Sequence, residues 1–126
     1  MNDDVSAYAL FIAERDDATT AFLVALHLGV PRRIGMPHRP DNHPYDVWVD
    51  RFRPGEVTVF PPLPAEGTPL PALKVPLDGD LVKNGRMSFR AFRTLEAAID
   101  CCRWLIPDAG IVREFVDDGT VIEHPL

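Results

Sequence analysis

The segment AYALFIAERDDATTAFLVALHLG, from Ala7 to Gly29, holds the longest apolar run of the chain and determines the predicted fold. Its first part, Ala7 to Glu14, is apolar and rich in aromatic residues, alternates weakly and is bounded by charged residues. These properties are typical of a strand that is largely buried. We therefore expect the first regular element to be a β-strand.

The second part of this segment carries the signals of a helix. Asp16 and Asp17 offer an N-cap and negative charge for a first turn, while Gly29 and Pro31 are stop signals. Between them, the residues from Ala18 to Leu28 are apolar around most of a helical circumference. Such a helix lies against a sheet with little of its surface in water. We therefore expect a central helix here.

Two segments with period-2 alternation predict an antiparallel pair of strands. They are DVWVDRF, residues 46–52, and EVTVF, residues 56–60, with Arg53-Pro54-Gly55 between them. β-Branched and aromatic residues favour strands, and Pro-Gly favours a turn. In the first strand, Trp48 and Phe52 are expected to share one face with Asp50. Because neither face is cleanly polar, we expect both to be partly covered.

A second helix is predicted over residues 88–105, with Ser88 as its N-cap. An apolar stripe at three- and four-residue spacings faces the core and consists of Phe89, Phe92, Leu95, Ile99, Cys102 and Ile106. The opposite face, expected to be solvated, carries Arg90, Arg93, Glu96, Asp100 and Arg103. Ion pairs are expected three residues apart, between Arg93 and Glu96 and between Asp100 and Arg103.

The last predicted element is a hairpin over IVREFVDDGTVIE, residues 111–123. A three-residue loop, Asp117 to Gly119, with the glycine in the left-handed conformation, places Arg113 opposite Glu123. A two-residue turn would instead place Glu114 opposite Glu123, which pairs like charges. We therefore expect the three-residue loop, because a Glu114–Glu123 pair would need a cation or a shared proton.

In order, the elements read β-α-β-β-α-β-β. Helices that interrupt antiparallel hairpins give an α+β domain, with an antiparallel sheet and both helices on one of its faces. A chain of 126 residues is the size of one domain, so we expect a single compact domain over residues 1–126. Proline fixes φ and removes a backbone donor, so the proline-rich residues 30–46 and 61–76 are expected to be connections, and the second cannot be an interior strand.

The composition limits the compartment and the partners. The net charge of −6 would repel a phosphate backbone, so direct nucleic-acid binding is not expected. No apolar run approaches the ~20 residues that span a bilayer, and the start MNDDVSAY lacks the features of a secretory signal. The adjacent Cys101 and Cys102 exclude a disulfide framework and fit a reducing compartment. We expect a cytoplasmic protein without a membrane partner, whose acidic surface either serves solubility or docks on a basic protein.

The loop PHRPDNHPYD, residues 37–46, is the candidate for a metal or acid–base site. His38, Asp41, His43 and Asp46 are ligand types that zinc uses. The two histidines are five residues apart in a segment that proline keeps from being helical, and no further ligand is evident. A hydrolytic His–Asp pair here lacks an activated serine or cysteine. The favoured interpretation is a stiff polar loop, and no cofactor is expected.

A small basic island precedes this loop. Arg32 and Arg33, together with Arg39, could bind a small anion, because arginine contacts carboxylate or phosphate bidentately. No glycine-rich phosphate cradle accompanies them. The alternative is a surface that pairs with nearby aspartates.

The second predicted helix carries both cysteines and a tryptophan. Cys102 lies on the apolar stripe, and Cys101 lies about 100° around the helix, beside Ala97 and Trp104. Near a helix C-terminus the dipole disfavours a thiolate, so a nucleophilic cysteine is not expected. Trp104 lies off the stripe, which suits a protein contact. The alternative is that the proline-rich segment covers it.

No catalytic set is assembled in the sequence, which favours a small acidic non-enzymatic protein that binds another macromolecule. Inhibitors, immunity proteins and anti-defence proteins of phages or mobile elements are of this type. Tyr45, Trp48 and Trp104 are the candidate partner-binding residues. The alternative is a small enzyme, or a metal- or anion-binding domain, that uses the loop from His38 to Asp46. A homodimer that pairs edge strands of the terminal hairpin is compatible with either.

Overall fold

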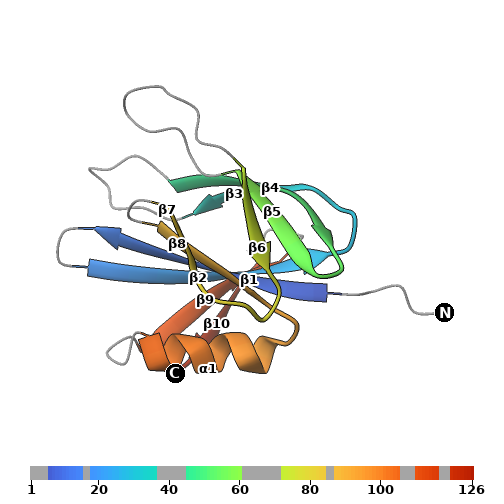
Figure 1. Ribbon diagram of the computed structural model, residues 1–126. Coiled ribbons are helices and arrows are strands. Elements are labelled where there is room, and N and C mark those ends of the chain that lie inside the picture. The colour runs from blue at the N-terminus through green and yellow to red at the C-terminus, as the bar shows by residue number, and fades with distance from the viewer. Residues whose placement is uncertain are drawn as a thin grey trace.

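The chain forms two β-sheets and one helix in a computed structural model (Figure 1). The structure describes residues 6–15, 18–36, 45–60, 72–84, 87–105, 110–116 and 120–126. Within these ranges the elements are β1 (Ser6–Arg15), β2 (Ala18–His27), β3 (Arg32–Met36), β4 (Tyr45–Arg53), β5 (Glu56–Phe60), β6 (Leu73–Pro76), β7 (Val82–Asn84), β8 (Met87–Phe92), α1 (Leu95–Leu105), β9 (Ile111–Phe115) and β10 (Val121–Pro125). The fold is therefore dominated by strands, with one helix where two were expected.

The larger sheet, sheet A, has the strand order β10-β9-β2-β1-β8-β7. Its centre is the long antiparallel hairpin of β1 and β2, in which Ser6 pairs with His27 and Arg15 with Ala18. β8 runs antiparallel to β1, whereas β9 runs parallel to β2, so sheet A is mixed. The smaller sheet, sheet B, is antiparallel and has the order β3-β4-β5-β6.

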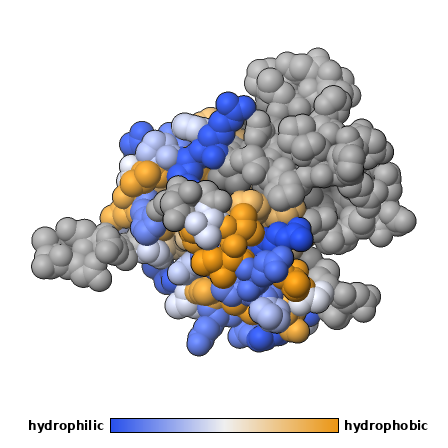
Figure 2. All heavy atoms as spheres, turned by 180° about the vertical axis from the view of Figure 1, so that it is seen from behind, coloured by the Kyte–Doolittle hydropathy of each residue, from blue (hydrophilic) through white to orange (hydrophobic). Residues whose placement is uncertain are grey.

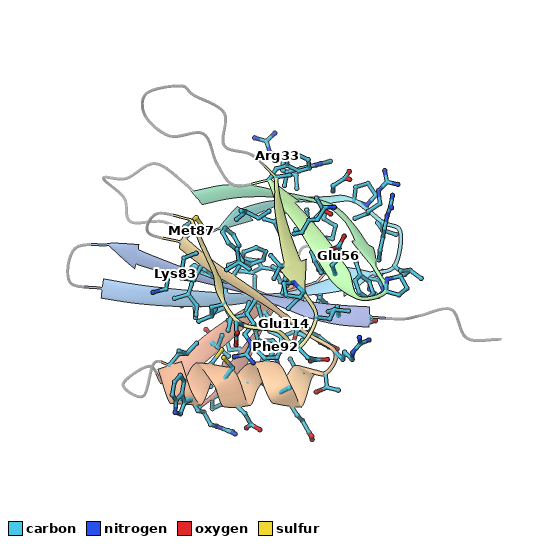
Figure 3. The ribbon with its side chains drawn as sticks, in the orientation of Figure 1. Arg33, Glu56, Lys83, Met87, Phe92 and Glu114 are labelled. Carbon is cyan, nitrogen blue, oxygen red and sulfur yellow. The ribbon has the colours of Figure 1, made fainter. Side chains whose placement is uncertain are left out.

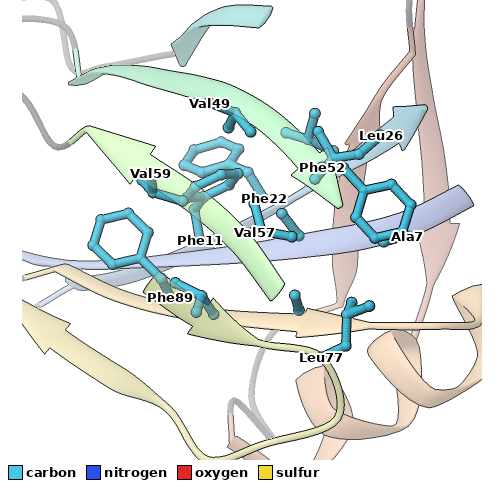
Figure 4. Packing of buried hydrophobic residues seen from close by; sticks show 14 of the residues in the cluster. Ala7, Phe11, Phe22, Leu26, Val49, Phe52, Val57, Val59, Leu77 and Phe89 are labelled. Carbon is cyan, nitrogen blue, oxygen red and sulfur yellow. The ribbon is translucent and has the colours of Figure 1, made fainter. Parts of the chain in front are cut away.

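The elements stack in three layers, with sheet A between sheet B and α1 (Figure 1). The inter-sheet core, part of which is drawn in Figure 4, consists of Ala7, Ala9, Phe11, Phe22, Val24, Leu26, Val49, Phe52, Val57, Val59, Val75, Leu77, Met87, Phe89 and Ala91. The helix-side core, between sheet A and α1, consists of Leu10, Ile12, Leu23, Phe92, Ala98, Cys102 and Val112. Sheet A is therefore buried on both faces at its centre.

The prediction of a helix over residues 18–28 was wrong, because this segment contains strand β2. Phe22, Val24 and Leu26 point into the inter-sheet core, while Leu23 points into the helix-side core. A strand buried on both faces has no polar face, so it loses the alternation by which strands are recognised. Its apolar run then cannot be distinguished from that of a buried helix.

The second predicted helix is shorter than expected. It begins at Leu95, after Thr94, whose Oγ1 accepts a hydrogen bond from the Ala97 N–H at 3.2 Å and so caps the first turn. The preceding residues form strand β8, in which Phe89 points into the inter-sheet core and Phe92 into the helix-side core. These two phenylalanines are three residues apart, a spacing that also fits one stripe of a helix. In the structure they lie on opposite faces of a strand.

The remainder of that helix agrees with the prediction. Its apolar stripe packs in the helix-side core, and Asp100 and Arg103 form the expected ion pair at 2.9 Å. Arg93 precedes the helix and pairs with Asp78 at 2.8 Å instead of with Glu96. Among the residues that the structure describes, no helix has the length and apolar character needed to cross a membrane.

The predicted strand pair is confirmed as β4 and β5, joined by a turn in which Gly55 has a φ of 98°, a value that glycine adopts readily. The faces of β4 were predicted wrongly, because Val49 and Phe52 both point into the inter-sheet core. The pairing register shifts after Val49, so Asp50 is the extra residue of a β-bulge. The bulge turns Phe52 inward and leaves Trp48 on the outer face of sheet B.

The terminal hairpin of β9 and β10 has the predicted register. Arg113 lies opposite Glu123, with Nε and Oε2 3.5 Å apart, and Phe115 lies opposite Val121. Glu114 faces Ile122, so the alternative pairing of two glutamates does not occur. The predicted register is therefore confirmed for β9 and β10, while residues 117–119 lie outside the described residues.

The outer strands β10 and β6 each contain a proline whose backbone nitrogen points away from the neighbouring strand of its sheet. The Leu126 N–H donates to the Gly110 carbonyl at 2.9 Å, so even-numbered residues of β10 bond to β9 and Pro125 faces outward. In β6, the Leu77 N–H donates to a carbonyl of the β4–β5 turn, so Pro76 faces outward in the same way. Proline has no N–H to offer a further strand, which protects an exposed edge. Residues 30–46 and 61–76 were expected to be connections, but Arg32–Met36 form β3 and Leu73–Pro76 form β6, so each segment contains a strand among its described residues.

Removing apolar atoms from either face of β2 should destabilise the protein. Leu23→Ala is expected to lower the free energy of unfolding by about 2 to 5 kcal/mol, and Val24→Ala by a smaller amount, because each side chain fills a different core. Urea unfolding followed by circular dichroism measures both losses, with Lys74→Ala on the exposed side of β6 as the control. If either neighbour accepted alanine without loss, β2 would not be buried on both faces.

Candidate functional site

A groove of about 450 Å³ lies between α1 and β8. Its walls are Arg90 and Phe92 from β8 and Ala97, Asp100, Cys101 and Trp104 from α1. Asp78, from the segment between β6 and β7, also lines it. We refer to this feature as the helix-side groove.

The wall formed by α1 follows from the geometry of the helix. Ala97, Cys101 and Trp104 are spaced by four and three residues, so they lie along one side of the helix, next to the stripe that packs on sheet A. Trp104 is 81% exposed, the highest value among the large apolar side chains that the structure describes. Residues 61–71 of the proline-rich segment lie outside the described residues, so the alternative in which this segment covers Trp104 stays a prediction.

The wall formed by β8 contains an arginine in unusual surroundings. The guanidinium of Arg90 lies over the ring of Phe92, with Cζ 4.9 Å from the ring centroid. Its Nη1 is 3.8 Å from the Cys101 sulfur, a weak acceptor. Its Nε is buried and has no hydrogen-bond partner. Figure 3 shows Phe92 between sheet A and α1, at the level of this groove.

The two carboxylates of the groove already have cationic partners. Asp78 Oδ2 lies 2.8 Å from Arg93 Nε, and Asp100 Oδ1 lies 2.9 Å from Arg103 Nη1. Within the described ranges, no carboxylate forms an ion pair with Arg90. The groove therefore has an apolar and cationic centre with paired charges around it.

The two cysteines are poor nucleophiles. Burial raises the pKa of the Cys101 thiol above its ordinary value of 9.0, and the positive charge of Arg90 offsets this only in part. Burial, with Cys101 beside it, raises the pKa of Cys102 to about 12. Both residues are free thiols, and Cys102 belongs to the helix-side core, as the sequence predicted. A thiol with a raised pKa carries little thiolate at neutral pH.

The predicted partner-binding residues do not form one site. Trp48 lies on the outer face of sheet B, opposite Phe60, and the two are 41% and 40% exposed. Trp104 lies on α1, at the other side of the three layers (Figure 1). The backbone of Tyr45 pairs with Met36, and its side chain lies outside what the structure describes. Trp48 and Trp104 would therefore contact different partners or different parts of one large partner.

The proposed metal and acid–base loop falls outside the described residues, so His38, Asp41 and His43 stay predictions. The backbone of Asp46 is placed, and it pairs with Gly35 in sheet B. In the part of the chain that is described, no three His, Cys, Asp or Glu side chains are grouped as metal ligands would be.

The two arginines of the basic island point in opposite directions. Arg32 points inward and donates from Nη1 to the Ala25 carbonyl at 2.6 Å and from Nη2 to the Val116 carbonyl at 3.3 Å, which ties sheet B to sheet A. Arg33 is exposed at the outer face of sheet B (Figure 3). An anion at Arg32 would have to compete with these two carbonyls.

A buried acid–base pair was missed by the sequence analysis. Glu114 is 5% exposed, and its Oε1 lies 2.6 Å from Nε2 of His124. Val112 is opposite His124 in the hairpin register and belongs to the helix-side core, so this pair lies on the α1 side of sheet A. The predicted register already placed Glu114 and His124 diagonally on one face, which was the available signal. A buried carboxylate needs such a partner.

The pH dependence of alkylation should report the surroundings of Cys101. In a Cys102→Ala background, the rate with iodoacetamide is expected to rise with pH through a midpoint above 9.0, because burial raises the pKa of this thiol. Arg90→Gln removes a charge that lowers this pKa, so it should move the midpoint higher. The same protein in urea supplies the control, with an ordinary midpoint. A downward shift in Arg90→Gln would contradict the contact.

Removing the histidine from the buried pair should destabilise the protein. His124→Ala leaves the Glu114 carboxylate buried without its partner and is expected to lower the free energy of unfolding by about 1 to 3 kcal/mol. Replacing both residues by leucine should recover much of this loss, because no orphaned charge remains. Urea unfolding at neutral pH compares the variants, and equal stability of His124→Ala and wild type would refute a stabilising pair.

Comparison of the chain with family models, with curated proteins and with solved structures found no match. The function has therefore to be inferred from the groove and the surfaces around it.

Proposed function

We propose that this protein acts by binding another protein, and that the helix-side groove with Trp104 is its contact surface. The observation that carries this proposal is the exposure of Trp104, 81%, beside a groove that the described residues leave open. Tryptophan and arginine dominate the energetics of protein interfaces, and here they occur in one groove. Ala97 and Cys101, which are partly exposed, add apolar surface between them.

The arrangement of charges supports the same conclusion. Protein interfaces have an apolar centre from which charged residues are depleted, surrounded by a polar rim. The ion pairs of Asp78 with Arg93 and of Asp100 with Arg103 lie around the apolar centre of the helix-side groove. Figure 2 shows the molecule from behind, where apolar residues lie among hydrophilic ones.

The proposed type of activity is non-enzymatic, as in an inhibitor, an immunity protein or an anti-defence protein. The net charge of −6 favours a partner with a basic surface. We place the protein in the cytoplasm, because free thiols at Cys101 and Cys102 suit a reducing compartment. The raised pKa of both thiols also argues against a cysteine nucleophile.

Two tryptophan variants test which face binds. A photo-crosslinking amino acid at position 100, on the groove, captures the partner in cells that produce the protein naturally, and mass spectrometry identifies it. With the purified partner, Trp104→Ala is expected to raise Kd by about 30-fold or more, as for a hot-spot tryptophan. Calorimetry measures this change.

Trp48→Ala is the matched control, because it removes the same side chain from the opposite layer. It should leave Kd within about twofold of the wild type, since surface changes away from an interface have small effects. Unfolding curves verify that both variants are folded. Unchanged binding by Trp104→Ala, or turnover of a substrate by the isolated protein, would reject the proposal.

A further inference from the structure

We propose that the helix-side groove binds a carboxylate side chain of the partner at Arg90, with the apolar stem of that residue, or its apolar neighbour, against Ala97 and Trp104. This inference rests on the proposed function and specifies the chemistry of the partner. The observation behind it is the environment of Arg90, whose buried Nε has no acceptor.

A guanidinium carries five N–H donors, and buried donors in proteins are nearly always satisfied. Within the described residues, Arg90 contacts only the Phe92 ring and the weakly accepting sulfur of Cys101. Both contacts hold the guanidinium in place without using its capacity to form strong hydrogen bonds. The groove therefore presents a fixed, partly desolvated cation without a strong acceptor, and a partner would have to approach its terminal nitrogens, because Nε is buried.

The acidic residues nearest to Arg90 do not supply that acceptor. Asp78 and Asp100 line the same groove, yet each forms a short ion pair with a different arginine. Arg93 and Arg103 thus neutralise the two carboxylates, and the positive charge of Arg90 is the one left over in the groove. Charge complementarity then calls for an anionic group from outside the chain.

A carboxylate with an apolar stem fits these surroundings better than a bare anion. The planar fork of arginine matches a carboxylate bidentately. The exposed Trp104, with Ala97 beside it, offers apolar surface within the same groove, which a hydrophilic ion such as phosphate would leave unused, whereas Phe92 is buried beneath Arg90. Because Trp104 stands out from the surface, the site suits a Glu or Asp side chain on a protein surface. One carboxylate at this point is compatible with a partner that is basic overall.

Nuclear magnetic resonance of the full-length protein tests this inference without the partner. The probes are 3-phenylpropionate, its uncharged amide 3-phenylpropanamide, and inorganic phosphate. We expect 3-phenylpropionate to shift the Nε–Hε signal of Arg90 and the indole signal of Trp104 in a saturable manner. The amide and phosphate should each bind at least tenfold more weakly.

Arg90→Gln identifies the Arg90 signal and should abolish the response of Trp104 to the carboxylate. Arg51→Gln, which removes an arginine that is paired with Asp50 on sheet B, away from the groove, is the control and should keep it. If Arg90→Gln does not fold, the comparison of carboxylate with amide in the wild type decides alone. Equal binding of the amide, or absence of saturable binding, would overturn the inference. Tighter binding of phosphate would identify a site for a free anion, which also overturns it.

The two proposals fail separately. If 3-phenylpropionate does not bind, but Trp104→Ala still weakens binding of the captured partner, the groove is a protein contact without carboxylate recognition. If Trp104→Ala has no effect on the partner, the proposed function itself is wrong, whatever the small probes do.

Discussion

The fold depends on the need to cover both faces of the β1–β2 hairpin. Along β2, Leu23 and Val24 are consecutive and fully buried, so apolar side chains leave the strand on both sides. A sheet of this kind is stable only between two other layers. Sheet B supplies one layer and α1 the other. Arg32 donates hydrogen bonds from sheet B to the carbonyl groups of Ala25 and Val116 and so links sheet B to sheet A.

This constraint explains which parts of the fold could be predicted from the sequence. The hairpin over residues 111–123 was predicted to the register, because the prediction used turn residues and cross-strand charges, which are local signals. β2 was mistaken for a helix, because burial on both faces removes the period-2 pattern that reveals a strand. Phe89 and Phe92 were assigned to one helix for a related reason, since their spacing fits a helical stripe although they leave β8 on opposite faces. The parallel pairing of β2 with β9 connects distant segments, and no local signal encodes it.

The same limits apply to the candidate site. Cys101 and Trp104 were located beside the core stripe correctly, since both lie in the part of the predicted helix that is helical. Arg90 was missed because the predicted helix was too long, which placed Arg90 on a solvated face when it belongs to a strand that faces α1. The wrong start of the second predicted helix is therefore the reason why Arg90 was not recognised as part of the helix-side groove. The residues of the histidine loop were predicted from composition alone, and His38, Asp41 and His43 lie outside the described residues.

Proline in the edge strands favours binding of a partner through side chains over binding through addition of a strand. Adding a strand to β10 would use the outward N–H groups of the odd-numbered residues, and Pro125 removes one of them from a strand of five residues. At the end of β6, after Pro76, the Asp78 N–H donates to the Ala91 carbonyl of β8, so this end of the strand is already bonded to sheet A. Pro125 disfavours the homodimer that would pair terminal hairpins, because few main-chain hydrogen bonds are available. Binding at α1 does not depend on main-chain hydrogen bonds. The apolar stripe of the helix is buried on sheet A, whereas Trp104 is exposed beside it. We therefore infer that Trp104 and the adjacent Arg90 are the apolar side chain and the cation on this side that another protein could contact.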